Sequence, residues 1–139
     1  MFQSINNVTL ELTFKKEERL CSKKAFENLL SSGSSSFLFP LKVIWIKTDY
    51  PLPHPAQIAF AVPKRRFKKA HDRNLIKRLL REAYRHNKHP FYQFLKEKEI
   101  RLQLLVVYIA PNMMTYHEIT PKVKGALDSI MAAIQKTAK

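Results

Sequence analysis

The residues of this chain best suited to do chemistry are cations, and they are concentrated in one segment. Residues 64–88 contain eleven lysines and arginines against two acids, Asp72 and Glu82. The segment therefore holds a net charge of +9 out of the chain's +14. Clustered Lys and Arg side chains bind phosphate groups, and a polyanion offsets the repulsion among them. This pattern predicts a binding site for nucleic acid or for an anionic membrane surface.

Helical spacing within this segment separates the cations from the apolar residues. At about 100° per residue, one side of a helix after Asp72 gathers Leu75, Ile76, Leu79, Leu80 and Ala83. The other side, over an arc of about 140°, carries Arg73, Lys77, Arg78, Arg81, Arg85 and Lys88. Cations spaced i, i+4 repel one another, and a cation at a helix N-terminus opposes the helix dipole. Phosphates lying along this face would remove both costs.

Two alternatives compete with a phosphate-binding face. A charged helix face is often merely solvated, but the near absence of acids from this one argues against that reading. A helix lying on a membrane surface needs a large exposed apolar face. Here the Leu and Ile face is needed for the core of a small domain. Nucleic acid is therefore the favoured partner.

Length and composition narrow the class of protein further. The 139 residues fit a single domain, and 45% apolar residues indicate that it folds. The longest apolar run, residues 104–110, is far shorter than a membrane span, and no secretory signal is visible at the N-terminus. A single cysteine, Cys21, excludes an internal disulfide and indicates a reducing, cytoplasmic compartment. Two glycines exclude a glycine-rich phosphate loop.

The first half of the chain is expected to form one helix and two strands. An apolar helical stripe begins after Ser22, a suitable N-cap, and ends at Gly33. The three serines that follow are expected to form a loop. Alternating or β-branched residues predict an extended N-terminal segment and two strands at residues 8–14, 41–48 and 57–62.

The second half is expected to alternate helix and strand. Asp72 is placed to cap a helix that ends near residue 88, because Pro90 bars its simple continuation. Residues 91–98 are expected to form a separate short helical piece, and residues 102–110 a strand covered on both faces. Thr120 and Pro121 are expected to begin the last helix, with a buried stripe of Val123, Leu127, Ile130 and Ile134. The predicted order is α-β-β-α-β-α, one α+β domain with a mixed sheet packed by helices.

The basic segment resembles a known family. Residues 60–85 read FAVPKRRFKKAHDRNLIKRLLREAYR. This is similar to the signature of the bacterial ribonuclease P protein component, in which a strand ends in a V-S-K-K-type turn before a helix that opens R-N-R-x-K-R-x-x-R-E. Upstream, Arg19-Leu20, Lys24-Ala25-Phe26 and Gly33 resemble the family's opening helix.

The resemblance implies a fold and a function. The fold would be ribonuclease P protein-like, of the ribosomal S5 domain 2-like type. The chain would be the RNA-binding subunit of a cytoplasmic ribonucleoprotein endonuclease, a hydrolase that removes the 5′ leader of precursor tRNA. The RNA subunit would do the chemistry with Mg²⁺ that it binds itself, and the protein would supply no catalytic side chain and no cofactor. Neither membrane nor DNA is an expected partner.

The resemblance and the charge pattern together name the site residues. Contacts to RNA are expected from Lys64, Arg65, Lys68, Lys69, Arg73, Asn74, Lys77, Arg78, Arg81 and Arg85. A cleft for the single-stranded leader is expected at Phe26, Leu30, Trp45 and Phe60. Two positions depart from the family pattern: Leu75 stands where many members have a second arginine, and Leu30 replaces a second aromatic residue.

Two other functions remain as alternatives. A general RNA-binding structural protein, of the ribosomal or RNA-chaperone type, would share the charge and the small size. A self-sufficient metal nuclease would need clustered carboxylates. The eleven acids of this chain are scattered, and His86 and His89 have no third ligand nearby in the sequence. The nuclease is therefore disfavoured.

Overall fold

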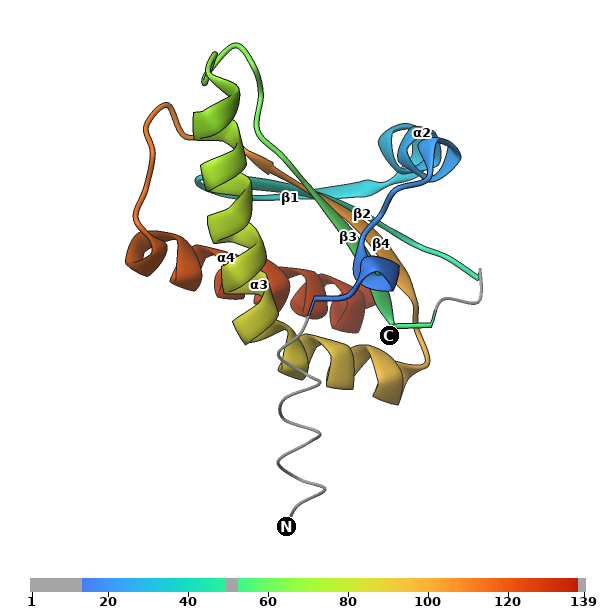
Figure 1. The fold of residues 1–139 in the computed structure, drawn as a ribbon. Coiled ribbons are helices and arrows are strands. Elements are labelled where there is room, and N and C mark those ends of the chain that lie inside the picture. The colour runs from blue at the N-terminus through green and yellow to red at the C-terminus, as the bar shows by residue number, and fades with distance from the viewer. Residues whose placement is uncertain (1–13, 50–52, 138–139) are drawn as a thin grey trace.

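The apolar run at residues 102–108 forms a central strand of a four-stranded sheet. The computed structural model describes residues 14–49 and 53–137 (Figure 1). The strand order is β1-β2-β4-β3, with bounds Ser34–Leu38, Leu41–Lys47, Leu102–Tyr108 and Ala56–Ala61. β2 pairs antiparallel with both β1 and β4, and β3 runs parallel to β4. Six of the seven residues of β4 are buried, as predicted for a strand covered on both faces.

Helices cover both faces of this sheet. A short 3-10 helix, η1 (Lys16–Glu18), precedes α2 (Lys23–Ser32), and two longer helices follow, α3 (Ala70–Lys98) and α4 (Tyr116–Thr137). α3 and α4 lie on one face and α2 on the other (Figure 1). The element order after η1 is α-β-β-β-α-β-α, which confirms the predicted α+β class with a mixed sheet. Within the described residues, no helix is long and apolar enough to cross a membrane.

The strand directions bring three connections to one end of the sheet. β3 and β4 are parallel and therefore end together, and β2, which is antiparallel to β4, begins there. We call this the basic end. It carries the β1–β2 turn at residues 39–40, the β3–α3 connection at residues 62–69 and the β4–α4 loop at residues 109–115.

Two predicted features of the first half are confirmed and one is wrong. The Ser22 side chain accepts a hydrogen bond from the Ala25 N–H at 3.2 Å, and Gly33 ends α2. The serines after Gly33 form strand β1 rather than a loop, because they pair with β2 and because Ser36 hydrogen bonds Ser129 of α4 at 3.0 Å. The extended segment expected at residues 8–14 lies, apart from Phe14, outside the described residues.

α3 was expected to stop before Pro90, and this expectation is wrong. The helix runs through Pro90 to Lys98, so the separate helical piece predicted at residues 91–98 is part of it. Figure 1 shows a bend along α3, as expected for an internal proline. The second half buries Phe91, Tyr92 and Leu95, and burying each contributes about 1.5–3 kcal/mol. Together these contributions exceed the roughly 3 kcal/mol cost of the proline.

Both long helices begin earlier than predicted. α3 starts at Ala70 with Lys69 as its N-cap residue, so Asp72 lies inside the first turn. α4 starts at Tyr116, because Thr115 and Glu118 form a reciprocal capping pair, and Pro121 lies inside the helix. The stripe predicted for α4 is confirmed: Val123, Leu127, Ile130 and Ile134 are all buried.

Candidate nucleic-acid interface

The basic turn, residues 64–69, is held by its single aromatic residue and by its backbone. Phe67 is 8% exposed, and its ring centroid lies 6.0 Å from that of Tyr108 on β4. The Phe67 N–H donates to the carbonyl of Pro63 at 3.3 Å. The five cations of the turn are all exposed: Lys64, Arg65, Arg66, Lys68 and Lys69. The turn therefore presents charged side chains from an anchored backbone.

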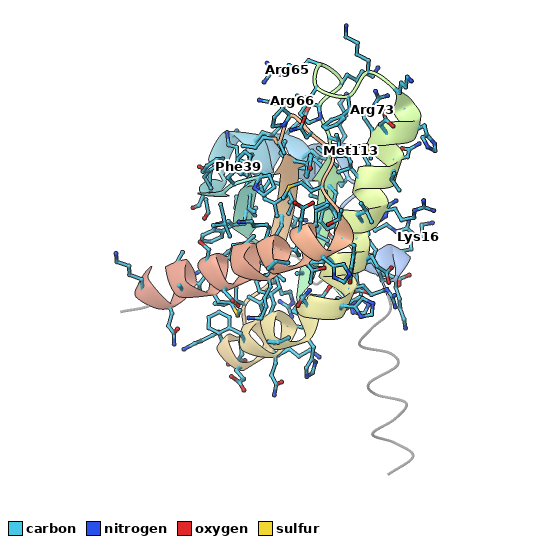
Figure 2. The ribbon with its side chains drawn as sticks, turned by 90° about the vertical axis from the view of Figure 1, so that its left-hand side faces the viewer. Lys16, Phe39, Arg65, Arg66, Arg73 and Met113 are labelled. Atoms are coloured by element: carbon cyan, nitrogen blue, oxygen red, sulfur yellow. The ribbon has the colours of Figure 1, made fainter. Side chains whose placement is uncertain are left out.

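Arg73 joins the basic turn to α3. Its Nη1 donates to the carbonyls of Phe67 at 2.7 Å and of Lys68 at 2.9 Å (Figure 2). A guanidinium group has five N–H donors, so other donors of Arg73 remain for a phosphate. The N-cap residue Lys69 makes no side-chain hydrogen bond to the first turn. The start of α3 thus combines helix N–H groups with cations, an arrangement suited to an anion.

The basic face of α3 lies opposite the residues that bury it. Ile76, Leu80 and Ala83 are fully buried against the sheet and α4. The predicted RNA-binding residues of the helix are exposed or partly exposed: Arg73, Asn74, Lys77, Arg78, Arg81 and Arg85. All ten predicted RNA-binding residues are therefore exposed or partly exposed, on the basic turn and on the face of α3 that follows it. That they contact RNA stays a prediction.

Glu82 is the acid on the rim of this face, and it is already engaged. Its carboxylate accepts hydrogen bonds from Arg85 and pairs with His86 at 3.1 Å. The hydrogen bond from Arg85 is the main reason that the pKa of Glu82 is lowered from its ordinary value. Arg85 therefore contributes less free positive charge than the cations near the start of α3.

Lys88 does not belong to the basic face, although the sequence pattern placed it there. Its side chain is 3% exposed and forms an ion pair with Glu18, which is 1% exposed. Glu18 also accepts a hydrogen bond from the Tyr92 hydroxyl at 2.6 Å and one from the Lys15 N–H at 2.8 Å. Local sequence patterns do not reveal this pair, because its two members are 70 positions apart.

The contacts around the buried pair lower the pKa of Glu18. Burial alone raises the pKa of this carboxyl, but hydrogen bonds from the Lys15 backbone, Lys88 and Tyr92 outweigh burial, so its pKa is lowered. The Tyr92 hydroxyl also accepts a hydrogen bond from Tyr84 at 3.2 Å, which extends the network into the core. These contacts fasten η1 to α3.

Trp45 lies in the core and the partly buried Phe60 packs against it, both on the face of the sheet opposite to Phe26, so the structure does not bring the predicted cleft residues together. Trp45 is 9% exposed and packs on the α3 and α4 side of the sheet. Phe60 packs on the same side, with its ring edge-on to Tyr84 at 5.9 Å. Phe26, a residue of α2, packs on the other side of the sheet. Successive side chains of a strand point to opposite faces of the sheet. Ile44 and Ile46, which flank Trp45 on β2, face α2, so Trp45 faces away from α2.

A strip of the sheet runs beside α2 towards the basic turn. Lys42, Val107 and Ala61 occupy paired positions across β2, β4 and β3. Lys42 is exposed, and the other two side chains are partly exposed. Helical geometry places Phe26 and Leu30 on one flank of α2. Leu30 is 63% exposed, and Phe26 packs in the same cluster as Val107 and Ala61. We call these five residues the sheet strip.

A groove lies on the opposite flank of α2. It has a volume of about 960 Å³, and its walls come from η1, α2 and the far ends of β2, β3 and β4. Three of its lining residues are cations, Lys16, Arg19 and Lys24, against one acid, Glu17. Sequence reasoning missed this groove, because its lining comes from separate segments. As for metals, the described part of the chain contains no group of three or more His, Cys, Asp or Glu residues that could hold an ion.

Comparison with known proteins agrees with this geometry. The family model described as Ribonuclease P matches residues 14–131. The ribonuclease P protein component of Porphyromonas gingivalis is 26% identical over 124 residues, covering 88% of this chain and 90% of the relative. That of Haemophilus influenzae is 33% identical over 87 residues, covering 61% of this chain and 71% of the relative.

Solved structures share the fold. A mutant of the Staphylococcus aureus RNase P protein has a TM-score of 0.68 at 21% identity, covering 93% of this chain and 94% of that one. The RNase P protein of Thermotoga maritima has a TM-score of 0.64 at 20% identity, covering 79% and 94%. The family model spans most of the chain, including the basic turn, the basic face and the sheet strip. The chain therefore belongs to the ribonuclease P protein family.

Proposed function

We propose that this protein is the protein subunit of a ribonuclease P, in which it binds the catalytic RNA and the 5′ leader of precursor tRNA. The observation that carries the proposal is the set of exposed and partly exposed cations on the anchored turn and on the basic face of α3, which Arg73 joins. Membership of the family supports the same reading. The phosphates of the RNA subunit lie along this surface in our proposal.

The leader occupies the sheet strip in our proposal. An unpaired strand binds where apolar or aromatic surfaces adjoin cations, because bases pack on the former and phosphates pair with the latter. The strip offers Phe26 and Leu30 on one side and Lys42 within it, and it leads to the basic turn. Our proposal leaves Trp45 and Phe60 out of this site, because they pack on the other face of the sheet.

The chemistry belongs to the RNA subunit in our proposal. Hydrolysis is endonucleolytic, releases the leader, and depends on Mg²⁺ bound mainly by the RNA. This protein contributes affinity and positioning. A general RNA-binding structural protein is the competing reading, and it predicts affinity for RNA without an effect on cleavage.

Reconstitution tests the proposed function. The protein, mixed with a bacterial ribonuclease P RNA and Mg²⁺, is expected to increase the rate at which precursor tRNA is matured at its 5′ end. The measurement is single-turnover cleavage with and without the protein, with protein alone as the control. Tight RNA binding without faster cleavage would support the structural-protein reading. Cleavage by the protein alone would support a protein nuclease.

Replacing Phe26 by leucine tests the sheet strip. Leucine keeps the apolar packing beneath α2 but removes the aromatic face, so the reconstituted enzyme is expected to bind leader-bearing precursor tRNA about 5- to 10-fold less tightly. Affinity for mature tRNA, which lacks the leader, is expected to stay unchanged. Phe26→Tyr is the matched control and should keep wild-type discrimination. Equal loss for both tRNAs would place Phe26 in a purely structural role.

A further inference from the structure

Two of the connections at the basic end each expose a large apolar side chain that takes no part in the surfaces described above. Phe39, in the β1–β2 turn, is 52% exposed, and Met113, in the β4–α4 loop, is 40% exposed. Burying such a side chain against a partner is favourable by about 1.5–3 kcal/mol, so both are available to contribute to binding. Figure 2 views this end of the sheet, with Phe39, Met113, Arg65 and Arg66 all on the side facing the viewer.

Hydrogen bonds and packing tie the three connections of the basic end together around the end of β4. The Ile109 N–H donates to the carbonyl of Pro40 at 2.8 Å, which joins the β1–β2 turn to the start of the β4–α4 loop. The Tyr108 hydroxyl donates to the carbonyl of Asn112 at 2.7 Å, next to Met113. The ring of Tyr108 also packs against Phe67 of the basic turn. Phe39, Met113 and the basic turn are thus presented by one supported unit.

The charges at this end select the kind of partner. The end of β1 with the β1–β2 turn, residues 37–40, and the β4–α4 loop, residues 109–115, contain no charged residue. The charge at this end comes from the basic turn, whose five cations are exposed, and from Lys42 at the start of β2, which is also exposed. An aromatic side chain and a thioether beside a cluster of cations fit a ligand that has both a flat apolar part and phosphates. A nucleotide base in an unpaired stretch of RNA has this chemistry.

We propose that Phe39 docks an unpaired base of the RNA whose phosphates lie on Arg65 and Arg66, at the same end of the sheet as Met113. This site is separate from the sheet strip, because Phe39 and Met113 lie in connections beyond the strand ends, whereas the strip lies on the strand surface beneath α2. The inference rests on the proposed function, since it assigns a further contact to the same RNA-binding subunit.

Substitutions at Phe39 test the inference with ribonuclease P RNA as the probe. Phe39→Ala is expected to weaken binding of the RNA about tenfold, equivalent to about 1.4 kcal/mol. The dependence of affinity on salt should stay as in the wild type, because no phosphate contact is lost. Phe39→Tyr should bind like the wild type. Phe39→Leu should behave like Phe39→Ala, because leucine is apolar but cannot stack.

The other outcomes contradict the inference in distinguishable ways. Unchanged RNA affinity in Phe39→Ala, together with loss in Arg78→Ala, would overturn the docking site and leave the proposed function standing. Wild-type protein that fails to bind the RNA at all would overturn both. Wild-type affinity in Phe39→Leu would replace stacking with simple apolar burial. Loss in Phe39→Ala of co-sedimentation with phosphatidylglycerol vesicles, or of self-association in the ultracentrifuge, with RNA affinity unchanged, would assign the surface to a membrane or to a second copy.

Discussion

Replacing Lys88 by methionine is expected to lower the free energy of unfolding by about 3–5 kcal/mol, the usual cost of leaving a buried charge without its partner. Glu18 would keep its hydrogen bonds from Lys15 and Tyr92 but lose the cation that balances its charge. Urea denaturation monitored by circular dichroism measures the change. A loss well below 1 kcal/mol would show that the pair does not fasten η1 to α3.

The double variant Glu18→Gln/Lys88→Met is the matched control. Tyr92 and Lys15 donate to different oxygens of Glu18, so glutamine can accept only one of these two hydrogen bonds. No unpaired charge remains, however, so part of the lost stability is expected to return. Recovery would show that the single variant fails through the orphaned carboxylate. If the double variant were as unstable as Lys88→Met, lost packing of the lysine stem or the lost hydrogen bond to Glu18 would be the cause instead.

Glu18 also makes a testable contribution to pH dependence. Its pKa in the folded protein is below the ordinary value of 4.5, so its ionised form stabilises the fold at higher pH. That contribution is fully present above 4.5 and is lost as the pH falls through the folded-state pKa. Glu18→Gln should therefore show a shallower loss of stability on acidification than the wild type. Parallel curves for the two proteins would rule out this linkage.

Neutralising three cations of the basic face is expected to weaken binding of the RNA subunit on the order of 100-fold, because each charge-assisted contact contributes about 1–3 kcal/mol. The variant is Lys77→Gln/Arg78→Gln/Arg81→Gln. The slope of log affinity against log salt should flatten by about 2–3 units, since fewer counterions are released. Filter binding across a salt series measures both quantities.

A second triple variant removes the same amount of charge elsewhere. Lys96→Gln/Lys98→Gln/Lys136→Gln changes exposed cations near the C-terminal ends of α3 and α4, away from the basic end. It is expected to keep nearly wild-type affinity and slope. If the two triple variants lost affinity equally, total charge would govern binding, and the basic face would have no special role.

The sequence was sufficient for features that depend on neighbouring residues. The cap at Ser22, the buried stripe of α4 and the segregation of cations on α3 all follow from local spacing, and the structure contains them. The sequence was insufficient for features that depend on contacts between segments far apart in the chain. A shift of one residue along the strand would turn Trp45 from the core to α2. The sequence does not distinguish the two registers, because apolar residues lie on both faces of this strand.

Tertiary contacts also overrode two local signals. Pro90 is a strong stop signal, yet the aromatic and leucine residues beyond it bury enough surface to continue the helix. Lys88 has the spacing of a phosphate-binding cation, yet Glu18 draws it into the interior. No spacing rule within α3 could distinguish Lys88 from Arg81, because the partner lies outside the helix.

The hydrogen bonds of Arg73 affect how tightly the basic turn binds an anionic partner. A flexible six-residue loop would lose conformational entropy at the moment of binding, at about 1–2 kcal/mol for each residue that becomes fixed. Because Arg73 holds the carbonyls of Phe67 and Lys68, much of that entropy is lost when the chain folds. The cations of the turn are thus preorganised before they meet a phosphate, and the free energy of their attraction goes into affinity rather than into ordering the loop.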